Sequence, residues 1–328
     1  MQIICARYKQ QGCSNQAASL IVDSWRPHTR AVYNTYITKW KLYAAKNAIP
    51  HDKSDIAQTA NFLADLYSNG ASYSAINAAR SALSAYLPLI DGHTVGSHPT
   101  ICKLVKGVFE NRPALPKYTD TWDVNTVLEY LERFVPLEKL TLKELTLKTC
   151  MLLALVTGQR GHALYSLKLT DVKMYSKKCV LLFSSLLKTT RPGVHNEPAE
   201  ITALDENETL CPVKHLEQYI QKTRTLRGET QQVFISHSKP HAPVGKQTWS
   251  RWIKQTLSGA GIDVTRYTAH STRAASCSAA AKMGLPLKTI MRAAGWTNAK
   301  TFTKFYKREN SSATCFSQKV LDGYVHCK

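Results

Sequence analysis

The chain has 328 residues and a formal net charge of +20, from 43 lysines and arginines against 23 acidic residues. This length accommodates two domains, and the 44% hydrophobic content excludes a largely disordered basic protein. The positive charge predicts a polyanionic partner, with nucleic acid as the leading candidate. No apolar run reaches the roughly 18 residues of a membrane helix, and residues 1–9 carry charge too early for a signal peptide.

Residues from about 14 to 111 are predicted to be almost wholly helical. Apolar residues recur at three- and four-residue steps after His28, Ser54 and Ser72, and a short fourth helix covers about 99 to 110. Three basic residues among these helices are candidates for contact with a nucleic-acid backbone: Arg30, Lys39 and Arg80.

The helical pattern breaks at residues 112–116, where two closely spaced prolines predict a stiff joint. We therefore expect a helical domain over 1–112, a linker over 113–119 and a second domain over 120–328. Three strand-like runs, near 171–174, 179–183 and 199–204, predict a small antiparallel sheet within the second domain. The expected fold class is thus mainly α with a small antiparallel β-sheet (α+β). The helices expected in the second domain are 123–134, 141–157, 212–223, 246–257, 268–283, 287–293 and 299–307.

The nine cysteines are odd in number, scattered and nowhere arranged as C-x-x-C. This spacing argues against a disulfide framework and against a zinc site. It favours free thiols in a reducing compartment.

A group of chemically versatile side chains lies near the C-terminus. His270 and Arg273 are three residues apart, on one face of a predicted helix. A guanidinium donates two parallel N–H groups to phosphate oxygens, and an adjacent imidazole can accept a proton. Trp296 offers an indole N–H, and Tyr306 offers a phenol that becomes nucleophilic when its proton is removed. Singly these residues fit a surface helix or a core, but together they suit attack on a phosphodiester by tyrosine.

Two further groups are needed for that reaction, and both have upstream candidates. A second guanidinium should share the charge of the phosphorane, and Arg160 fits because it follows the helix end at Gly158. The departing 5′ oxygen must be protonated, and Lys188 lies at the edge of a predicted hairpin turn. Lys177 and Lys178 compete with it for that role, and a solvated turn lysine is the ordinary alternative.

The order Arg, Lys, His-x-x-Arg, Trp, Tyr resembles the tyrosine recombinases (phage-integrase family), which share catalytic-core chemistry with type IB topoisomerases. Residues 28–90 resemble the family's helical core-binding domain, and residues 120–328 resemble its catalytic domain. The pieces at 295–298 and 302–306 look most like recombinases of eukaryotic mobile elements of the DIRS and Crypton kinds. Ala163 stands where relatives usually carry an acidic residue.

The resemblance implies two domains that close as a C-shaped clamp on double-stranded DNA. Tyr306 would attack the scissile phosphate and leave a 3′-phosphotyrosyl bond and a free 5′ hydroxyl. Arg160 and Arg273 would hold the non-bridging oxygens, and His270 would assist proton movement. Lys188 would protonate the leaving oxygen, whereas Trp296 would donate a hydrogen bond or buttress the site. Basic residues of the catalytic domain expected to contact DNA are Lys246, Arg251 and Lys254.

The same resemblance carries implications for cofactors, assembly and location. Two fixed guanidiniums stabilise the charge, so no metal or other cofactor is implied, and the phosphotyrosyl bond makes ATP unnecessary. Phe316, Val320 and Tyr324 recur at four-residue steps, predicting a short amphipathic helix. That helix packs either on its own domain or on a neighbouring protomer, as the family's dimers and tetramers on DNA imply. The expected location is the nucleus in a eukaryotic host and the cytoplasm otherwise.

Two other classes of function stay open. A type IB topoisomerase would use the same chemistry as a monomer on one duplex, but only 33 positions separate Arg273 from Tyr306, without a long inserted linker. A catalytically silent DNA-binding protein, domesticated from a mobile element, is the non-enzyme alternative. Retention of all six candidate residues argues against such decay.

Overall fold

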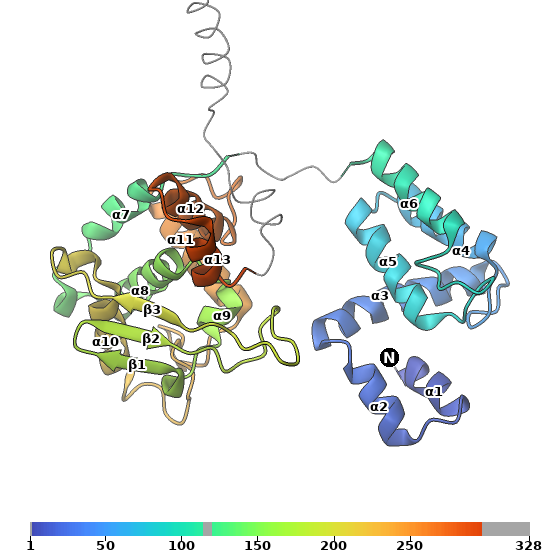
Figure 1. Cartoon of the computed structure of the whole chain (residues 1–328), viewed down its shortest axis with the longest axis horizontal. Helices are drawn as coiled ribbons and strands as arrows, with labels where there is room; N and C mark the ends of the chain where they lie inside the picture. The colour runs from blue at the N-terminus through green and yellow to red at the C-terminus, as the bar shows by residue number, and fades with distance from the viewer. Residues whose placement is uncertain (1, 114–119, 297–328) are drawn as a thin grey trace, which may run out of the picture. The chain divides into compact units, whose positions relative to one another are not determined.

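The computed structural model describes residues 2–113 and 120–296. The chain divides into two compact units, Met1–Pro116 and Lys117–Lys328, and each is described by itself (Figure 1). The predicted linker spans this division, and most of it lies outside the described residues. The helix expected at 299–307 and the amphipathic segment from Phe316 also lie outside them.

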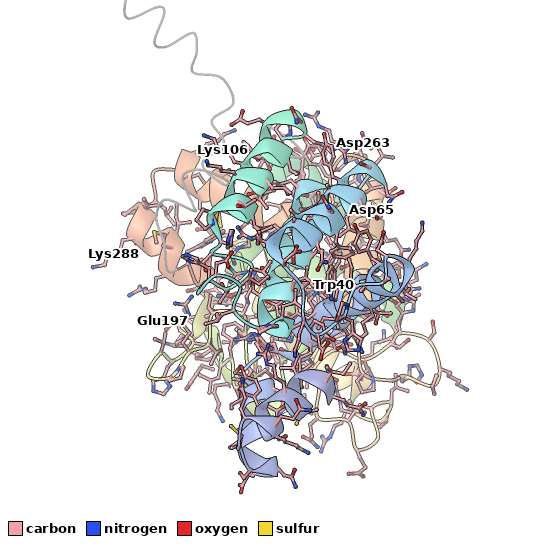
Figure 2. All side chains as sticks on the ribbon, turned by 90° about the vertical axis from the view of Figure 1, so that its right-hand side faces the viewer. Trp40, Asp65, Lys106, Glu197, Asp263 and Lys288 are labelled. Carbon is pink, nitrogen blue, oxygen red and sulfur yellow. The ribbon has the colours of Figure 1, made fainter. Side chains whose placement is uncertain are left out.

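The N-terminal unit is built from packed helices (Figure 1). The long helix α3 packs along α5, and α4 packs against α5 and α6. Trp40 lies fully buried among these helices (Figure 2), with its ring edge against Phe62 at a centroid distance of 5.3 Å. The helices are α1 (Gln2–Gln10), α2 (Asn15–Asp23), α3 (Pro27–Lys46), α4 (Ile56–Ser68), α5 (Tyr73–Tyr86) and α6 (Pro99–Asn111).

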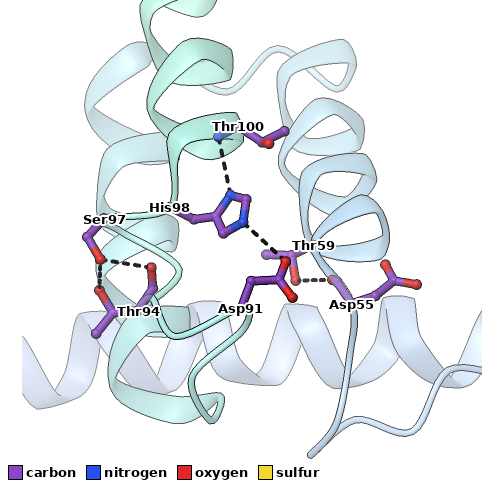
Figure 3. A network of polar contacts seen from close by, with 7 residues as sticks. All are labelled: Asp55, Thr59, Asp91, Thr94, Ser97, His98 and Thr100. Atoms are coloured by element: carbon purple, nitrogen blue, oxygen red, sulfur yellow. Dashed lines mark hydrogen bonds and ion pairs between the residues drawn. The ribbon is translucent and has the colours of Figure 1, made fainter.

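A polar network fixes the connection between α5 and α6 (Figure 3). The His98 Nδ1 atom accepts the backbone N–H of Thr100 at 3.2 Å, which caps the start of α6. The His98 Nε2 atom lies 3.5 Å from the Asp91 carboxylate, and the Thr59 hydroxyl donates to the Asp55 carbonyl at 3.0 Å. The two contacts of His98 thus connect the α5–α6 segment with the first turn of α6, and the contact of Thr59 lies in the first turn of α4.

Helix α8 (Leu142–Thr157) is the central helix of the C-terminal unit. It packs against α10, α11 and α12, and most of its residues are buried. A capping box between Thr141 and Glu144 begins it, and Gly158 ends it in the left-handed conformation. The other helices are α7 (Val124–Glu132), α9 (Gly161–Tyr165), α10 (Pro212–Thr223), α11 (Lys246–Gly259), α12 (Ser271–Lys282) and α13 (Leu287–Ala294), with short 3-10 turns at Leu137–Lys139, Leu169–Asp171 and Glu208–Leu210.

The sheet of this unit has three antiparallel strands in the order β1–β2–β3. They are β1 (Val172–Tyr175), β2 (Lys178–Leu181) and β3 (Ala199–Thr202). Leu181 pairs with Val172 on one side and with Ala199 on the other, and the long β2–β3 connection projects beyond the sheet (Figure 1). A mainly helical fold with a small antiparallel sheet confirms the predicted fold class. None of the helices among the described residues is long and apolar enough to span a membrane.

Candidate active site

A pocket of about 400 Å³ lies in the C-terminal unit, beside the end of α8. Its walls come from the α8–α9 connection, from α9, from α11 and from the start of α12. Three of the catalytic residues predicted from the sequence line it together: Arg160, His270 and Arg273. Residues far apart in the chain therefore meet at one site, as the sequence-based hypothesis requires.

Arg160 is held at the start of α9 by a tight turn. The preceding Gly158 has a φ of +57°, a conformation that side chains disfavour. A Cβ on Gly158 would also lie 3.3 Å from the Cys277 Sγ atom and 3.5 Å from the Ala294 Cβ atom. The turn is therefore packed against α12 and α13, and this packing fixes the point from which Arg160 extends.

Arg273 is the most enclosed of the candidate residues, with 2% of its surface exposed. Its Nη1 atom donates to the carbonyls of Gly158 and Ala294, both at 2.6 Å. These carbonyls lie at the C-terminal ends of α8 and α13, where the helix dipole attracts a cation. Arg273 therefore ties two helix ends together, a structural role that the sequence did not indicate.

Trp296 is the last described residue, and its ring lies beside both arginines. The ring centroid is 4.1 Å from the guanidinium carbon of Arg273 and 5.5 Å from that of Arg160. These distances are typical of cation–π contacts. Burial raises the pKa of the neighbouring Cys277 thiol, while the charge of Arg273 and a hydrogen bond with Trp296 act in the opposite direction. Trp296 thus places its ring beside both guanidiniums and hydrogen-bonds with Cys277, but it does not line the pocket itself.

His270 precedes the first residue of α12, so its imidazole lies at the N-terminus of that helix. The indole of Trp122 donates to the Ser271 hydroxyl at 2.9 Å and holds this end of the helix in place. Desolvation lowers the pKa of His270, and the positive charges of Arg273, Arg160 and Lys188 lower it further. Although the residue remains accessible to solvent, its imidazole is therefore neutral at neutral pH and can accept a proton.

The lowered pKa of His270 also distinguishes Lys188 from Lys177 and Lys178, the other two candidates for protonating the leaving oxygen. Lys188 is exposed in a turn of the β2–β3 connection, and its charge acts on the imidazole. Lys177 lies 3.7 Å from the Asp205 carboxylate, and Lys178 lies 2.9 Å from that of Glu200. Both competitors are thus paired with carboxylates, whereas the charge of Lys188 acts on His270 in the pocket.

Several residues near the pocket were not recognised from the sequence. The Gln159 side chain donates to the Ala293 carbonyl at 2.7 Å and so connects the α8–α9 turn to α13. Trp249 packs so closely on Gly161 that a Cβ there would lie 2.9 Å from the indole. In the sequence, only the two glycines that flank Gln159 and Arg160 indicated a tightly packed turn.

Ala163, which stands where relatives usually carry an acidic residue, has apolar surroundings in the structure. Ala163 is buried in the core of the unit and takes no part in a polar contact through its side chain. His162, the residue before it, is exposed and places its ring 5.3 Å from that of Tyr165. His162 and Tyr165 both line the pocket. Tyr306 lies outside the described residues, so its position in the site stays a prediction.

The candidate DNA contacts occupy two kinds of environment. Lys246, Arg251 and Lys254 are exposed on α11, and Lys246 also lines the pocket. In the N-terminal unit, the side chains of the candidate residues are held by neighbouring groups or partly buried. Arg30 forms an ion pair with Asp23, Lys39 is exposed with its ammonium 5.7 Å from the Tyr36 ring centroid, and Arg80 is half-buried on α5.

Within residues 2–113 and 120–296, no group of three or more His, Cys, Asp or Glu side chains is arranged to hold a metal ion. The cysteines of the same ranges are free thiols.

Comparison with known proteins identifies the family. The Phage integrase family matches residues 118–312, which is more than half of the chain, and the chain belongs to that family. A search of curated proteins found no match.

Several solved structures share the fold. The Tn1549 transposon integrase in complex with transposon right end DNA matches with a TM-score of 0.61 and 14% identity, over 98% of this chain and 99% of that one. The XerH site-specific recombinase bound to palindromic difH substrate matches with a TM-score of 0.57 and 13% identity, over 90% and 78%. A lambda integrase (75–356) dimer bound to a COC′ core site matches with a TM-score of 0.55 and 16% identity, over 95% and 96%.

Proposed function

We propose that the chain is a site-specific DNA recombinase of a mobile element, acting through a 3′-phosphotyrosyl intermediate on Tyr306. The observation that carries this proposal is the convergence of Arg160, His270 and Arg273 on one pocket, with Lys188 close enough to act on the imidazole. Two guanidiniums and a neutral base around one cavity, with the charge of Lys188 acting on that base, support phosphoryl transfer to a hydroxyl.

The roles follow from the chemistry of each group. As the bond from the Tyr306 oxygen to phosphorus forms, the phenolic proton passes to neutral His270. The bond from phosphorus to the 5′ oxygen breaks, and Lys188 gives that oxygen a proton. Arg160 and Arg273 neutralise the non-bridging oxygens, and the partial positive charge at the N-terminus of α12 adds to their effect. Religation reverses these steps on a second 5′ hydroxyl.

Double-stranded DNA is the proposed partner, and assembly is proposed to take place on it. The net charge of +20 supports a DNA partner. The similar structures are recombinases bound to DNA, including a lambda integrase tetramer on a Holliday junction. We expect a monomer in isolation and dimers, then tetramers, on DNA that carries the site.

A finer assignment rests on the sequence. The pieces at 295–298 and 302–306 support a mobile-element recombinase of the DIRS or Crypton kind, with a nuclear location in a eukaryotic host. The segment from Ser311 onward would then dock on a neighbouring protomer.

Strand exchange distinguishes this function from relaxation by a topoisomerase. Two plasmids that carry a site selected by the protein are incubated with the full chain, with the chain truncated before Ser311, or with the Tyr306→Phe variant as inactive control. The proposal predicts joined plasmids with the full chain, and a larger loss of joining than of single-site binding after truncation. Efficient supercoil relaxation without joining, by one protomer per duplex, would contradict it and favour a topoisomerase.

A further inference from the structure

A second pocket of the C-terminal unit lies away from the residues that form the candidate active site. Its volume is about 470 Å³, within the range of about 300–1,000 Å³ that small-molecule sites occupy. Its walls come from the segment after α7, the turn at Leu137–Lys139, α8, the turn at Glu208–Leu210 and the start of α10. None of the described residues that line it also lines the catalytic pocket. The proposed strand-transfer chemistry therefore makes no use of this second pocket.

Lys148 places a buried cation at this pocket, with only 1% of its surface exposed. Its ammonium donates to the Phe134 carbonyl at 2.8 Å, and burial lowers its pKa to about 8, against the opposite effect of Glu132. Over residues 2–113 and 120–296 Lys148 forms no ion pair, and the Glu132 carboxylate accepts the Asn207 amide instead. A lysine is rarely fully buried without a paired anion. The ammonium therefore lacks the counter-charge that its burial usually requires.

His215 lines the same pocket and carries a lone pair that no described residue satisfies. The side chain is fully buried, and its Nδ1 atom lies 2.8 Å from the Cys211 carbonyl. Because a carbonyl oxygen only accepts, Nδ1 carries the proton and Nε2 carries the lone pair. Burial, with the charge of Lys148 in addition, lowers the pKa of His215 to about 4, so the imidazole is neutral at neutral pH. Its buried Nε2 atom therefore requires a hydrogen-bond donor.

The two unsatisfied groups define the chemistry of a ligand. The Lys148 ammonium requires an anionic oxygen, and the His215 Nε2 atom requires an O–H group. A third part of the wall is apolar and consists of Phe134, Val135 and Leu137, which suits an organic body on the same molecule. Hydroxycarboxylates and the monoanions of phosphate monoesters both combine an anionic oxygen with a hydroxyl group.

We propose that this pocket binds a small organic oxyanion that carries a hydroxyl group, with Lys148 donating to the anionic oxygen and His215 accepting from the hydroxyl. The apolar body of the ligand packs against the segment after α7. Binding supplies a counter-charge to the ammonium and a donor to the imidazole, so it stabilises the packing of α8 against α10. This site is independent of the proposed recombinase function.

Titration calorimetry of the DNA-free full chain with four probes that share a phenyl ring tests the ligand chemistry. The pH is about 5.5, where a phosphate monoester with a second pKa near 6 keeps one proton. Mandelate and phenyl phosphate have both required groups, phenylacetate lacks the hydroxyl, and benzyl alcohol lacks the charge. At least one of the first two should bind about 10- to 100-fold more tightly than the last two, the range for a hydrogen bond to a charged group. Binding of mandelate alone identifies a hydroxycarboxylate as the source, and binding of phenyl phosphate alone identifies a phosphate monoester.

Substitutions at the two polar residues test their roles. Lys148→Met should lower the affinity for the binding probe by about 10- to 100-fold, whereas Lys143→Met, which replaces an exposed lysine of the same helix, should not change it. His215→Gln keeps an acceptor near the position of Nε2 and should keep the affinity within about threefold, but His215→Asn lacks that acceptor and should lose about 10-fold. Melting curves establish that each variant is folded, and if Lys148→Met is not, the two His215 variants decide.

Three results would overturn the proposal. Neither mandelate nor phenyl phosphate binds, which would leave a buried water as the partner of Nε2. The affinity is unchanged in Lys148→Met, or it is equal in the two His215 variants. The affinity falls in Arg160→Ala but not in Lys148→Met, which would place the probe in the catalytic pocket. Because covalent adducts on DNA take no part in these measurements, failure of this site leaves the recombinase proposal intact, and absence of adducts leaves this site intact.

Discussion

Replacing Arg273 by lysine tests whether this residue acts on the reaction itself. The positive charge remains, but one ammonium cannot reproduce the paired N–H groups of a guanidinium. If Arg273 holds the phosphate in the transition state, cleavage should fall by about 100- to 1000-fold, the range for loss of one such donor group. DNA affinity should change by no more than about threefold, since the number of cations that meet phosphates is unchanged.

The Arg273→Lys substitution should also lower the free energy of unfolding, because Arg273 forms hydrogen bonds within the folded unit. The guanidinium holds the carbonyls of Gly158 and Ala294, and the lysine ammonium can keep only one of them at good geometry. Loss of one charged hydrogen bond corresponds to about 1.5–3 kcal/mol. For a unit of this size, in which each kcal/mol lowers the melting temperature by about 2–4 °C, the melting temperature should fall by about 3–12 °C.

The assay compares three quantities for each variant. Adduct formation is followed in single turnovers on a nicked duplex at saturating DNA and 25 °C, affinity is measured by fluorescence anisotropy in the Tyr306→Phe background, and melting by calorimetry. Arg133→Lys, an exposed substitution just after α7, is the matched control and should leave all three unchanged. Equal loss of cleavage and affinity in Arg273→Lys would refute the catalytic role and make Arg273 one more backbone contact.

Two further predictions concern histidines. The pKa of His270, measured by NMR in the DNA-free protein, should lie below its ordinary value, and Lys188→Ala should raise it because a nearby positive charge is removed, whereas Lys177→Ala should not; equal shifts from both lysine variants would place Lys188 away from the site. Burial lowers the pKa of His215 from 6.5 to about 4, so the folded state disfavours its protonation. The stability that this neutral histidine allows is fully present above pH 6.5 and is lost as the pH falls toward 4, by up to about 3 kcal/mol. Urea unfolding at pH 7 and pH 4.5 should show a smaller acid loss for His215→Gln, and an identical loss would contradict this assignment.

The fold followed closely from sequence signals that act locally. The helix expected at 141–157 is observed as α8, because its capping box and its terminal glycine lie in the adjacent sequence. Strand ends were less predictable, since they depend on the partner strand. The run at 179–183 is observed as Lys178–Leu181, because β3 pairs with β2 only as far as Leu181.

The first helix, α1, was not expected, because its ends are not marked by clear apolar periodicity. Its place depends on distant contacts instead. The Arg7 guanidinium donates to the carbonyls of Tyr86 and Leu87, at 2.8 and 3.1 Å, and so joins α1 to the end of α5. A contact across about 80 residues leaves no local pattern in the sequence.

The difference between local sequence signals and contacts between distant residues also applies to the candidate active site. Residue types and spacing were enough to select Arg160, His270 and Arg273, because the chemistry demands those groups. The anchoring of Arg273 was not predictable, since Gly158 lies 115 positions away from it in the sequence. The contact of Trp296 with both guanidiniums likewise depends on how α13 ends against the α8–α9 turn.

The most direct test of the central claim is to trap and map the covalent intermediate. The full chain is incubated with a pool of randomised duplexes that each contain a nick, so that a cut near the nick releases a short fragment and prevents religation. The adduct is digested and the modified peptide is sequenced by mass spectrometry. The account predicts a 3′-phosphotyrosyl bond on Tyr306 and no adduct with Tyr306→Phe. Attachment to another tyrosine, Tyr324 included, or an adduct that persists in Tyr306→Phe, would contradict it.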